Sequence, residues 1–140
     1  MTSVLDTVTF DCADPARLAE FWARSLGWEV GEVDDEGAEV IAGGESGDAY
    51  ARPAGTTEET PWQGLYFQKV PEGKVVKNRV HLDLRPLDSM AAEVERSIAL
   101  GATVQQRVDV EDSFWTVMLD PEGNEFCILR GPEDGWAPNA

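Results

Sequence analysis

The sequence contains an internal repeat whose two copies are offset by 74 residues. The first copy is "LDTVTFDCADPARLAEFWARSLGWEV" at 5–30, and the second is "RVHLDLRPLDSMAAEVERSIALGATV" at 79–104. In each, a stretch of alternating polar and apolar residues is followed by an aspartate, an amphipathic run and a glycine. Alternation indicates a half-buried strand, and the aspartate and glycine mark the two ends of a helix. The repeat therefore predicts two equivalent modules that each begin with a strand and a helix.

Further strand-like segments follow each predicted helix. Three lie in the first half and three in the second, at 28–44, 48–54, 64–70, 102–111, 114–120 and 124–130. Gly- and acid-rich turns separate them, and "DPEG" before the last segment has the residue types of a hairpin turn. We therefore expect an α+β fold of two βαβββ modules, at about 1–72 and 77–131, within a single domain that spans 1–140.

The chain is strongly acidic. It has 27 acidic and 11 basic residues and a formal net charge of −16. A surface of this sign repels nucleic-acid phosphates and anionic lipids, so we expect no nucleic-acid partner. The N-terminal "MTSVLDTVTFDCADP" lacks the basic start and apolar run of a signal peptide, and the chain has no apolar run of transmembrane length. We expect a cytoplasmic protein that does not bind membranes.

The two cysteines and the C-terminal tail belong to no recognised motif. Cys12 and Cys127 lie outside any CxxC pair, and a cytoplasmic location keeps thiols reduced, so we expect both to be free. The tail "GPEDGWAPNA" at 131–140 is expected to be loose. Docking of Trp136 against a neighbouring subunit is the alternative.

Three stretches of the sequence are similar to a known family. "DCADPARLAEFWARSLGW", "LYFQKVPEGKVVKNRVHLDL" and "FWTVMLDPEGNEFCIL", in this order, resemble the glyoxalase-like domain proteins of the vicinal oxygen chelate superfamily. This superfamily includes glyoxalase I, extradiol dioxygenases and bleomycin-resistance proteins. The likeness covers nearly the whole chain. It implies two paired modules that form a curved mixed sheet around one cleft, with the helices outside, and it implies a homodimer.

The resemblance also implies a divalent metal, held by the first and last strands of each module. The matching positions are Thr7, Gln68, His81 and Cys127, where Gln68 and Cys127 follow from aligning "YFQ" with "EFC". Zn²⁺, Ni²⁺ and Fe²⁺ require imidazole, thiolate or carboxylate donors, and threonine and glutamine add no charge that offsets the desolvation of a cation. We therefore expect no metal, no other cofactor and no glyoxalase I activity.

Carboxylates on the same strand faces leave an alternative open. Asp83 or Asp11 would be the substitute ligand in an atypical metal site. With such a substitution a metal-dependent reaction would remain compatible with the sequence.

One face of the first strand in the second module carries three ionisable side chains. Arg79, His81 and Asp83 alternate with aliphatic residues, and the repeat makes Thr7 and Thr9 their counterparts in the first module. The planar guanidinium of an arginine can hold a ligand carboxylate or phosphate. His81, the only histidine, is the candidate general acid or base, and Asp83 would assist it. The alternative is a solvated strand face.

Aromatic and basic residues supply further ligand-binding candidates. Trp62, Tyr66 and Trp115 lie in or beside predicted strands and could stack on a flat ligand, with packing in the core as the alternative for each. The lysines of "VPEGKVVKN" at 70–78 either pair with surface acids in a linker or form a positive rim for an anionic ligand.

Three functions are compatible with these residues. The first is binding of a small molecule in a metal-free cleft, and the expected contacts are Thr7, Thr9, Tyr66, Gln68, Arg79, Cys127, Trp62 and Trp115. The second is a metal-independent isomerase or cyclase in which His81 relays a proton, assisted by Asp83 or Asp11. The third is a divalent-metal-dependent lyase or dioxygenase with an atypical site. The sequence does not specify the ligand or decide whether the protein is an enzyme.

Overall fold

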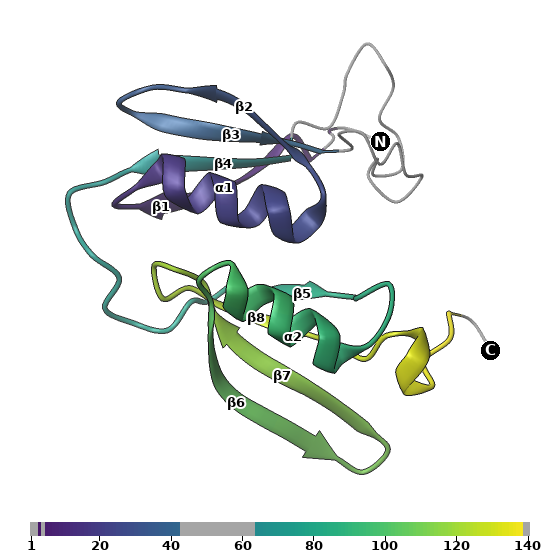
Figure 1. The fold of residues 1–140 in the computed structure, drawn as a ribbon. Coiled ribbons are helices and arrows are strands. Elements are labelled where there is room, and N and C mark those ends of the chain that lie inside the picture. Colours follow the sequence, from purple (N-terminus) through teal and green to yellow (C-terminus); the bar gives the residue numbers. More distant parts are fainter. Residues whose placement is uncertain (1–2, 4, 43–63, 139–140) are drawn as a thin grey trace. The chain divides into compact units, whose positions relative to one another are not determined.

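The computed structural model describes residues 3, 5–42 and 64–138 of the chain. The chain divides into two compact units, Met1–Gly73 (unit 1) and Lys74–Ala140 (unit 2), as Figure 1 shows. Within the described residues no helix is long and apolar enough to cross a membrane.

Unit 1 is a mixed four-stranded sheet with one helix. Its elements are β1 (Thr7–Cys12), α1 (Pro15–Leu26), β2 (Glu29–Val33), β3 (Gly37–Ile41) and β4 (Gly64–Lys69). The strand order is β1-β4-β3-β2, in which β1 and β4 are parallel and the other neighbours are antiparallel.

The first predicted strand after α1 is in fact a hairpin. The single expected segment at 28–44 contains both β2 and β3. The carboxylate of Asp34 turns the chain between them, because it accepts the backbone N–H groups of Glu36 at 2.8 Å and Gly37 at 3.0 Å. The strand expected at 48–54 lies outside the described residues.

Helix α1 begins and ends where the sequence predicts. The side chain of Asp14 accepts the backbone N–H of Arg17 at 3.3 Å, and Pro15 occupies the first turn, where its missing N–H costs no hydrogen bond. Gly27 ends the helix with a φ of 68°, a conformation that side chains disfavour. These local signals explain why the sequence predicts this helix correctly.

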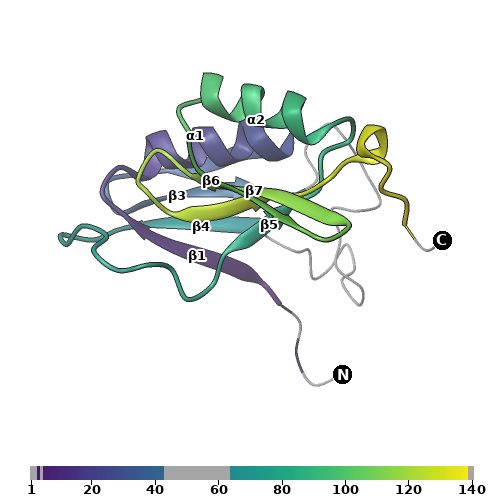
Figure 2. The ribbon, with the colours of Figure 1, turned by 90° about the horizontal axis from the view of Figure 1, so that it is seen from below.

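Figure 2 shows α1 on one face of the sheet of unit 1, and the buried side chains of this unit lie between the two. Trp22 of α1 is completely buried, and its ring centroid lies 5.6 Å from that of Phe10 on β1. Phe67 of β4 is also completely buried, with its ring centroid 5.2 Å from that of Phe10. Since side chains alternate along a strand, Thr9 and Tyr66 project from the opposite face.

Unit 2 repeats the same plan. Its elements are β5 (Leu82–Leu84), α2 (Met90–Ala99), β6 (Thr103–Val110), β7 (Ser113–Leu119), β8 (Glu125–Ile128) and a short 3-10 helix, η2 (Pro132–Asp134). The strand order β5-β8-β7-β6 matches that of unit 1, again with a parallel pair formed by the first and last strands. The predicted α+β class and the two βαβββ modules are therefore confirmed, with a separate four-stranded open sheet in each unit.

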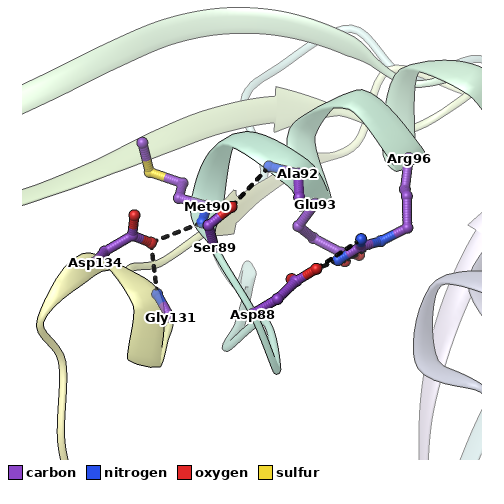
Figure 3. Close-up of polar contacts among 8 residues, drawn as sticks. All are labelled: Asp88, Ser89, Met90, Ala92, Glu93, Arg96, Gly131 and Asp134. Carbon is purple, nitrogen blue, oxygen red and sulfur yellow. Dashed lines mark hydrogen bonds and ion pairs between the residues drawn. The ribbon is translucent and has the colours of Figure 1, made fainter.

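The C-terminal tail is fastened to unit 2, so the expectation of a loose terminus is wrong for its described part. Figure 3 shows one oxygen of Asp134 accepting two backbone N–H groups, from Met90 at 2.7 Å and from Gly131 at 2.9 Å. The guanidinium of Arg85 lies 4.0 Å from the ring centroid of Trp136. Trp136 thus packs on its own unit.

Candidate functional site

Unit 2 has one sheet face covered by α2 and one that is not, which we call the open face. Thr116 of β7 faces α2, because its hydroxyl donates to the sulfur of Met90 at 3.5 Å. Phe126 and Ile128 of β8 point to the same side and are completely buried. Cys127, which lies between them, therefore projects from the open face.

Three side chains of the open face meet where β5 begins. Nδ1 of His81, the residue just before β5, lies 3.0 Å from Oδ1 of Asp83. Asp83 pairs with Cys127 across β5 and β8. The possible ligand atoms of these three residues all lie within 4.8 Å of one another. The side chains of His81 and Asp83 are 45% and 48% exposed, whereas Cys127 is buried. An accessible imidazole and carboxylate thus lie beside a buried thiol.

The thiol of Cys127 is a poor nucleophile in this setting. Burial, the charge of Asp83 and a hydrogen bond to that carboxylate raise the pKa of Cys127 to about 11, although the positive charge of Lys77 acts in the opposite direction. The thiolate, rather than the thiol, is the reactive form. At neutral pH the group is protonated, so the geometry does not favour covalent catalysis by a cysteine and histidine pair.

A buried carboxylate holds the chain that leads into this cluster. Oε1 of Glu125 lies 2.8 Å from Nζ of Lys74, and Oε2 accepts the backbone N–H of Asn78 at 2.9 Å. Burial raises the pKa of Glu125, but the bonds from Lys74 and Asn78 outweigh that effect and keep the pKa below its usual value. Lys74 therefore pairs with an acid, as the linker interpretation predicts, although the acid is buried.

Sequence reasoning did not single out Glu125 as a functional residue. The available signal was a carboxylate at the start of a short apolar strand, two residues before Cys127. Its partners come from a different part of the chain, so spacing within the strand could not identify them.

Strand register identifies the counterpart of Cys127 in unit 1. Thr9 pairs with Tyr66 in unit 1, as Asp83 pairs with Cys127 in unit 2. Tyr66 thus corresponds to Cys127. The motif alignment instead matched Gln68 with Cys127, and Gln68 lies two residues further along β4. The motif alignment is shifted because "YFQ" and "EFC" share only their central phenylalanine.

Thr7 and Tyr66, the unit 1 counterparts of His81 and Cys127, carry neutral hydroxyl groups. The hydroxyl of Thr7 donates to the carboxylate of Asp6 at 2.6 Å. The phenol of Tyr66 lies over Gly37, where a side chain larger than hydrogen would collide with it. Neither arrangement forms a donor set of the kind found in unit 2.

Three further residues, Trp115, Arg79 and Trp62, were predicted to contact a ligand. Trp115 shares the open face of unit 2, because it is two residues from Val117, which pairs with Cys127. Arg79 is exposed in the bend before β5. Trp62 lies outside the described residues, so its predicted role is not tested.

The donor types in unit 2 fit a divalent cation. Imidazole nitrogen, carboxylate oxygen and thiolate sulfur are all ligands of Zn²⁺ and related ions, and side-chain rotations can reduce separations of up to 4.8 Å to those around one ion. Thr7 and Gln68 would add only neutral oxygens. A cation held by His81, Asp83 and Cys127 would polarise a bound carbonyl or lower the pKa of a bound water.

The two βαβββ units have the architecture that the resemblance to the vicinal oxygen chelate superfamily implies. Within it, a family model described as "Glyoxalase-like domain" matches residues 7–129, and the chain belongs to this family. A comparison with curated protein sequences gives no match.

Solved structures show the same fold at low sequence identity. A glyoxalase/bleomycin resistance protein/dioxygenase family enzyme from Burkholderia phytofirmans PsJN has a TM-score of 0.62 and 18% identity, over 90% of this chain and 97% of that one. The fosfomycin resistance protein FosX from Listeria monocytogenes, in complex with Mn(II) and a dihydroxypropylphosphonic acid, has a TM-score of 0.63 and 12% identity, over 94% and 91%. The oxidase ChaP-H2 has a TM-score of 0.54 and 17% identity, over 93% and 94%.

Proposed function

We propose that this glyoxalase-like domain binds a small molecule on the open face of unit 2 and that His81 exchanges a proton with it. The observation that carries the proposal is the 3.0 Å contact between Nδ1 of His81 and Oδ1 of Asp83, both of which are accessible to solvent. Accessible titratable pairs of this kind are used in general acid and base catalysis.

Asp83 gives the imidazole a defined role. An ionised carboxylate can only accept hydrogen bonds, so it selects the neutral tautomer of His81 with the proton on Nδ1. The lone pair of Nε2 then remains available to accept a proton from a ligand, and the carboxylate stabilises the imidazolium that forms. This arrangement supports a metal-independent isomerase or cyclase, in which one base removes a proton and returns it elsewhere.

Neighbouring side chains indicate what kind of ligand would fit. Trp115 and Val117 present apolar surface on the same open face as Cys127 and favour a flat or apolar part of the ligand. Arg79, in the bend before β5, is available for a carboxylate or phosphate. A small organic acid combines both features.

Binding can be tested with metal-free protein, because the single histidine gives one unambiguous imidazole signal by NMR. We expect members of a library of small organic acids to shift the His81 signal, and we expect His81→Ala and Asp83→Asn to weaken binding at least about tenfold. Asp109→Asn, an exposed change of the same type on β6, is the matched control. Ligands that bind but leave the His81 signal unchanged in every case would contradict the proposal.

Turnover separates a catalyst from a binding protein. With any ligand that binds, His81→Gln should retain affinity within about threefold and lose turnover by a factor of about 100 or more, since general base catalysis contributes rate enhancements of that order. Turnover that survives in His81→Gln would show that another group moves the proton.

A metal-dependent lyase or dioxygenase is the second candidate. The specific observation in its favour is the group of three donor types within 4.8 Å. The Mn(II) in the FosX complex is a property of that protein, and at 12% identity it supports the idea only by analogy of fold. Activity that chelators abolish and a divalent cation restores would favour this candidate over the metal-free reaction.

A further inference from the structure

We propose that unit 2 binds a dianionic oxyanion, such as a phosphate group, through the guanidinium groups of Arg85 and Arg130, which we call the arginine pair. Arg85 directly follows β5, and Arg130 lies two residues beyond β8. Because Leu84 pairs with Ile128 in the parallel ladder of these strands, both arginines follow the same end of the sheet. The inference does not depend on the proposed function, which concerns His81.

The arginine pair is held in place by the chain around it. Nη1 of Arg85 donates to the backbone oxygen of Arg130 at 2.7 Å, and the Arg85 guanidinium lies 4.0 Å from the ring centroid of Trp136. Nη1 of Arg130 donates to the backbone oxygen of Asp112 at 3.2 Å, and the Arg130 guanidinium lies 5.7 Å from the ring centroid of Phe114. These contacts orient both side chains in advance, which reduces the entropy that binding of an anion would cost.

The arginine pair lacks the counter-ion that an acidic protein could supply. The sequence has 27 acidic residues, yet within the described part of the chain no carboxylate lies at ion-pairing distance from Arg85 or Arg130. Burial and the positive charge of Arg130 lower the pKa of Arg85, although the charge of Asp83 acts in the opposite direction. The two guanidinium groups therefore repel each other, and a bound anion would relieve this repulsion.

The remaining hydrogen-bond donors of the pair suit a phosphate group. A guanidinium carries five N–H donors in one plane, and each of these two donates one hydrogen bond to the described residues, so about four donors remain on each. Neighbouring N–H groups of a guanidinium bind two oxygens of a phosphate or carboxylate at once. Two positive charges match a phosphate dianion better than the single charge of a carboxylate. Inorganic phosphate and phosphate monoesters both present this dianion near neutral pH.

The arginine pair is separate from the His81 cluster. His81 lies just before β5 and Arg85 just after it, so at the rise of an extended chain their Cα atoms are about 13 Å apart. The ring beside Arg130 also belongs to the face that α2 covers, because Phe114 is two residues from Thr116 on β7. A phosphate group at the arginine pair should therefore not contact the imidazole.

The test is titration of the metal-free protein with inorganic phosphate at constant pH and ionic strength, followed by NMR. We expect the indole N–H signal of Trp136, identified by its loss in Trp136→Phe, to shift and saturate while the imidazole signal of His81 stays unchanged. Phenyl phosphate should shift the same indole signal if the site takes a phosphate monoester, and only inorganic phosphate should do so if the site takes the free ion. Acetate, a monoanion, should bind at least about tenfold more weakly than phosphate.

Variants test which side chains bind the anion. Arg85→Gln and Arg130→Gln should each weaken phosphate binding at least about tenfold, because each removes a charged donor. Arg85→Lys keeps the charge without the planar fork and should recover part of the lost affinity. Arg24→Gln, which changes an exposed arginine that is ion-paired with Glu20, is the matched control and should bind as the wild type does. Circular dichroism checks that all four variants fold.

Three results would overturn the inference. These are an indole signal of Trp136 that phosphate leaves unchanged, an affinity in the arginine-pair variants equal to that of Arg24→Gln, and an affinity that falls with Arg79→Gln as much as with Arg85→Gln. The last result would assign the anion to the arginine that the proposed function uses. Organic acids that bind without shifting the His81 signal would contradict the proposed function alone. The two proposals therefore fail by different measurements.

Discussion

At the scale of single residues, Glu125 shows how a buried charge can set the position of a reactive side chain. Its carboxylate binds Lys74 and the backbone of Asn78, three residues before His81. His81 lies outside the hydrogen-bonded ladder of β5, which covers only Leu82–Leu84. These bonds fix the segment 74–78, which leads into β5, and they therefore help to fix the position of the His81 imidazole.

Removal of Lys74 tests this anchor. Lys74→Met would leave the Glu125 carboxylate buried without its counter-ion, and we expect the free energy of unfolding to fall by about 3 kcal/mol at neutral pH. The double variant Lys74→Met/Glu125→Gln should be more stable than Lys74→Met alone, since no uncompensated charge remains. Urea unfolding of the metal-free proteins measures both. If the free energy of unfolding falls in the double variant by the sum of the decreases in Lys74→Met and Glu125→Gln alone, the two side chains do not stabilise each other.

At the scale of secondary structure, helix α2 has two N-terminal caps, one from the residue that precedes it and one from the distant C-terminal tail. The hydroxyl of Ser89 accepts the backbone N–H of Ala92 at 3.1 Å, and Asp134 of η2 accepts the backbone N–H of Met90 (Figure 3). An anionic side chain at a helix N-terminus also interacts favourably with the helix dipole. The tail therefore stabilises α2, and α2 in turn holds the tail.

Asp134→Ala should release the tail and destabilise α2. We expect the free energy of unfolding to fall by about 1 to 2 kcal/mol, because two backbone N–H groups lose a charged acceptor. Limited proteolysis should cut near Trp136 faster than in the wild-type chain. Glu133→Ala, an exposed change at the neighbouring position, should have neither effect. Equal proteolysis of the two variants would show that Asp134 does not fasten the tail.

These elements also show what the sequence could and could not predict. The repeat, with Asp14 and Gly27 as end signals, predicts the strand and the helix that begin each unit, because caps and alternation are local. The proximity of His81 to Asp83 follows from their spacing of two residues in extended chain, although His81 lies just before β5. The family alignment identifies Cys127 as a site residue. It matches Cys127 with Gln68, whereas the strand register matches Cys127 with Tyr66. The roles of Glu125 and Asp134 depend on partners more than 40 residues away, which no local pattern reveals.

At the scale of the whole molecule, charge is the dominant long-range feature. The formal net charge of −16 is spread over a chain of 140 residues, and the ion pairs of the described residues involve few of the 27 acidic groups. Repulsion among the remaining carboxylates opposes the compact state. Isolated surface ion pairs contribute at most about 1 kcal/mol each. Repulsion should therefore outweigh attraction in the response of stability to salt.

Salt should stabilise this protein at neutral pH. Raising NaCl from low ionic strength to about 0.15 M shortens the Debye length to about 8 Å, which screens repulsion between carboxylates on different elements. We expect Tm to rise by a few degrees, since about 1 kcal/mol shifts Tm by roughly 3 to 5 °C in a domain of this size. The measurement is thermal unfolding of chelator-treated protein followed by circular dichroism. Near pH 4.2, the isoelectric point of the sequence, net repulsion vanishes and the rise should disappear. A Tm that falls with salt at neutral pH would mean that ion pairs, such as that of Lys74 with Glu125, dominate the electrostatics of folding.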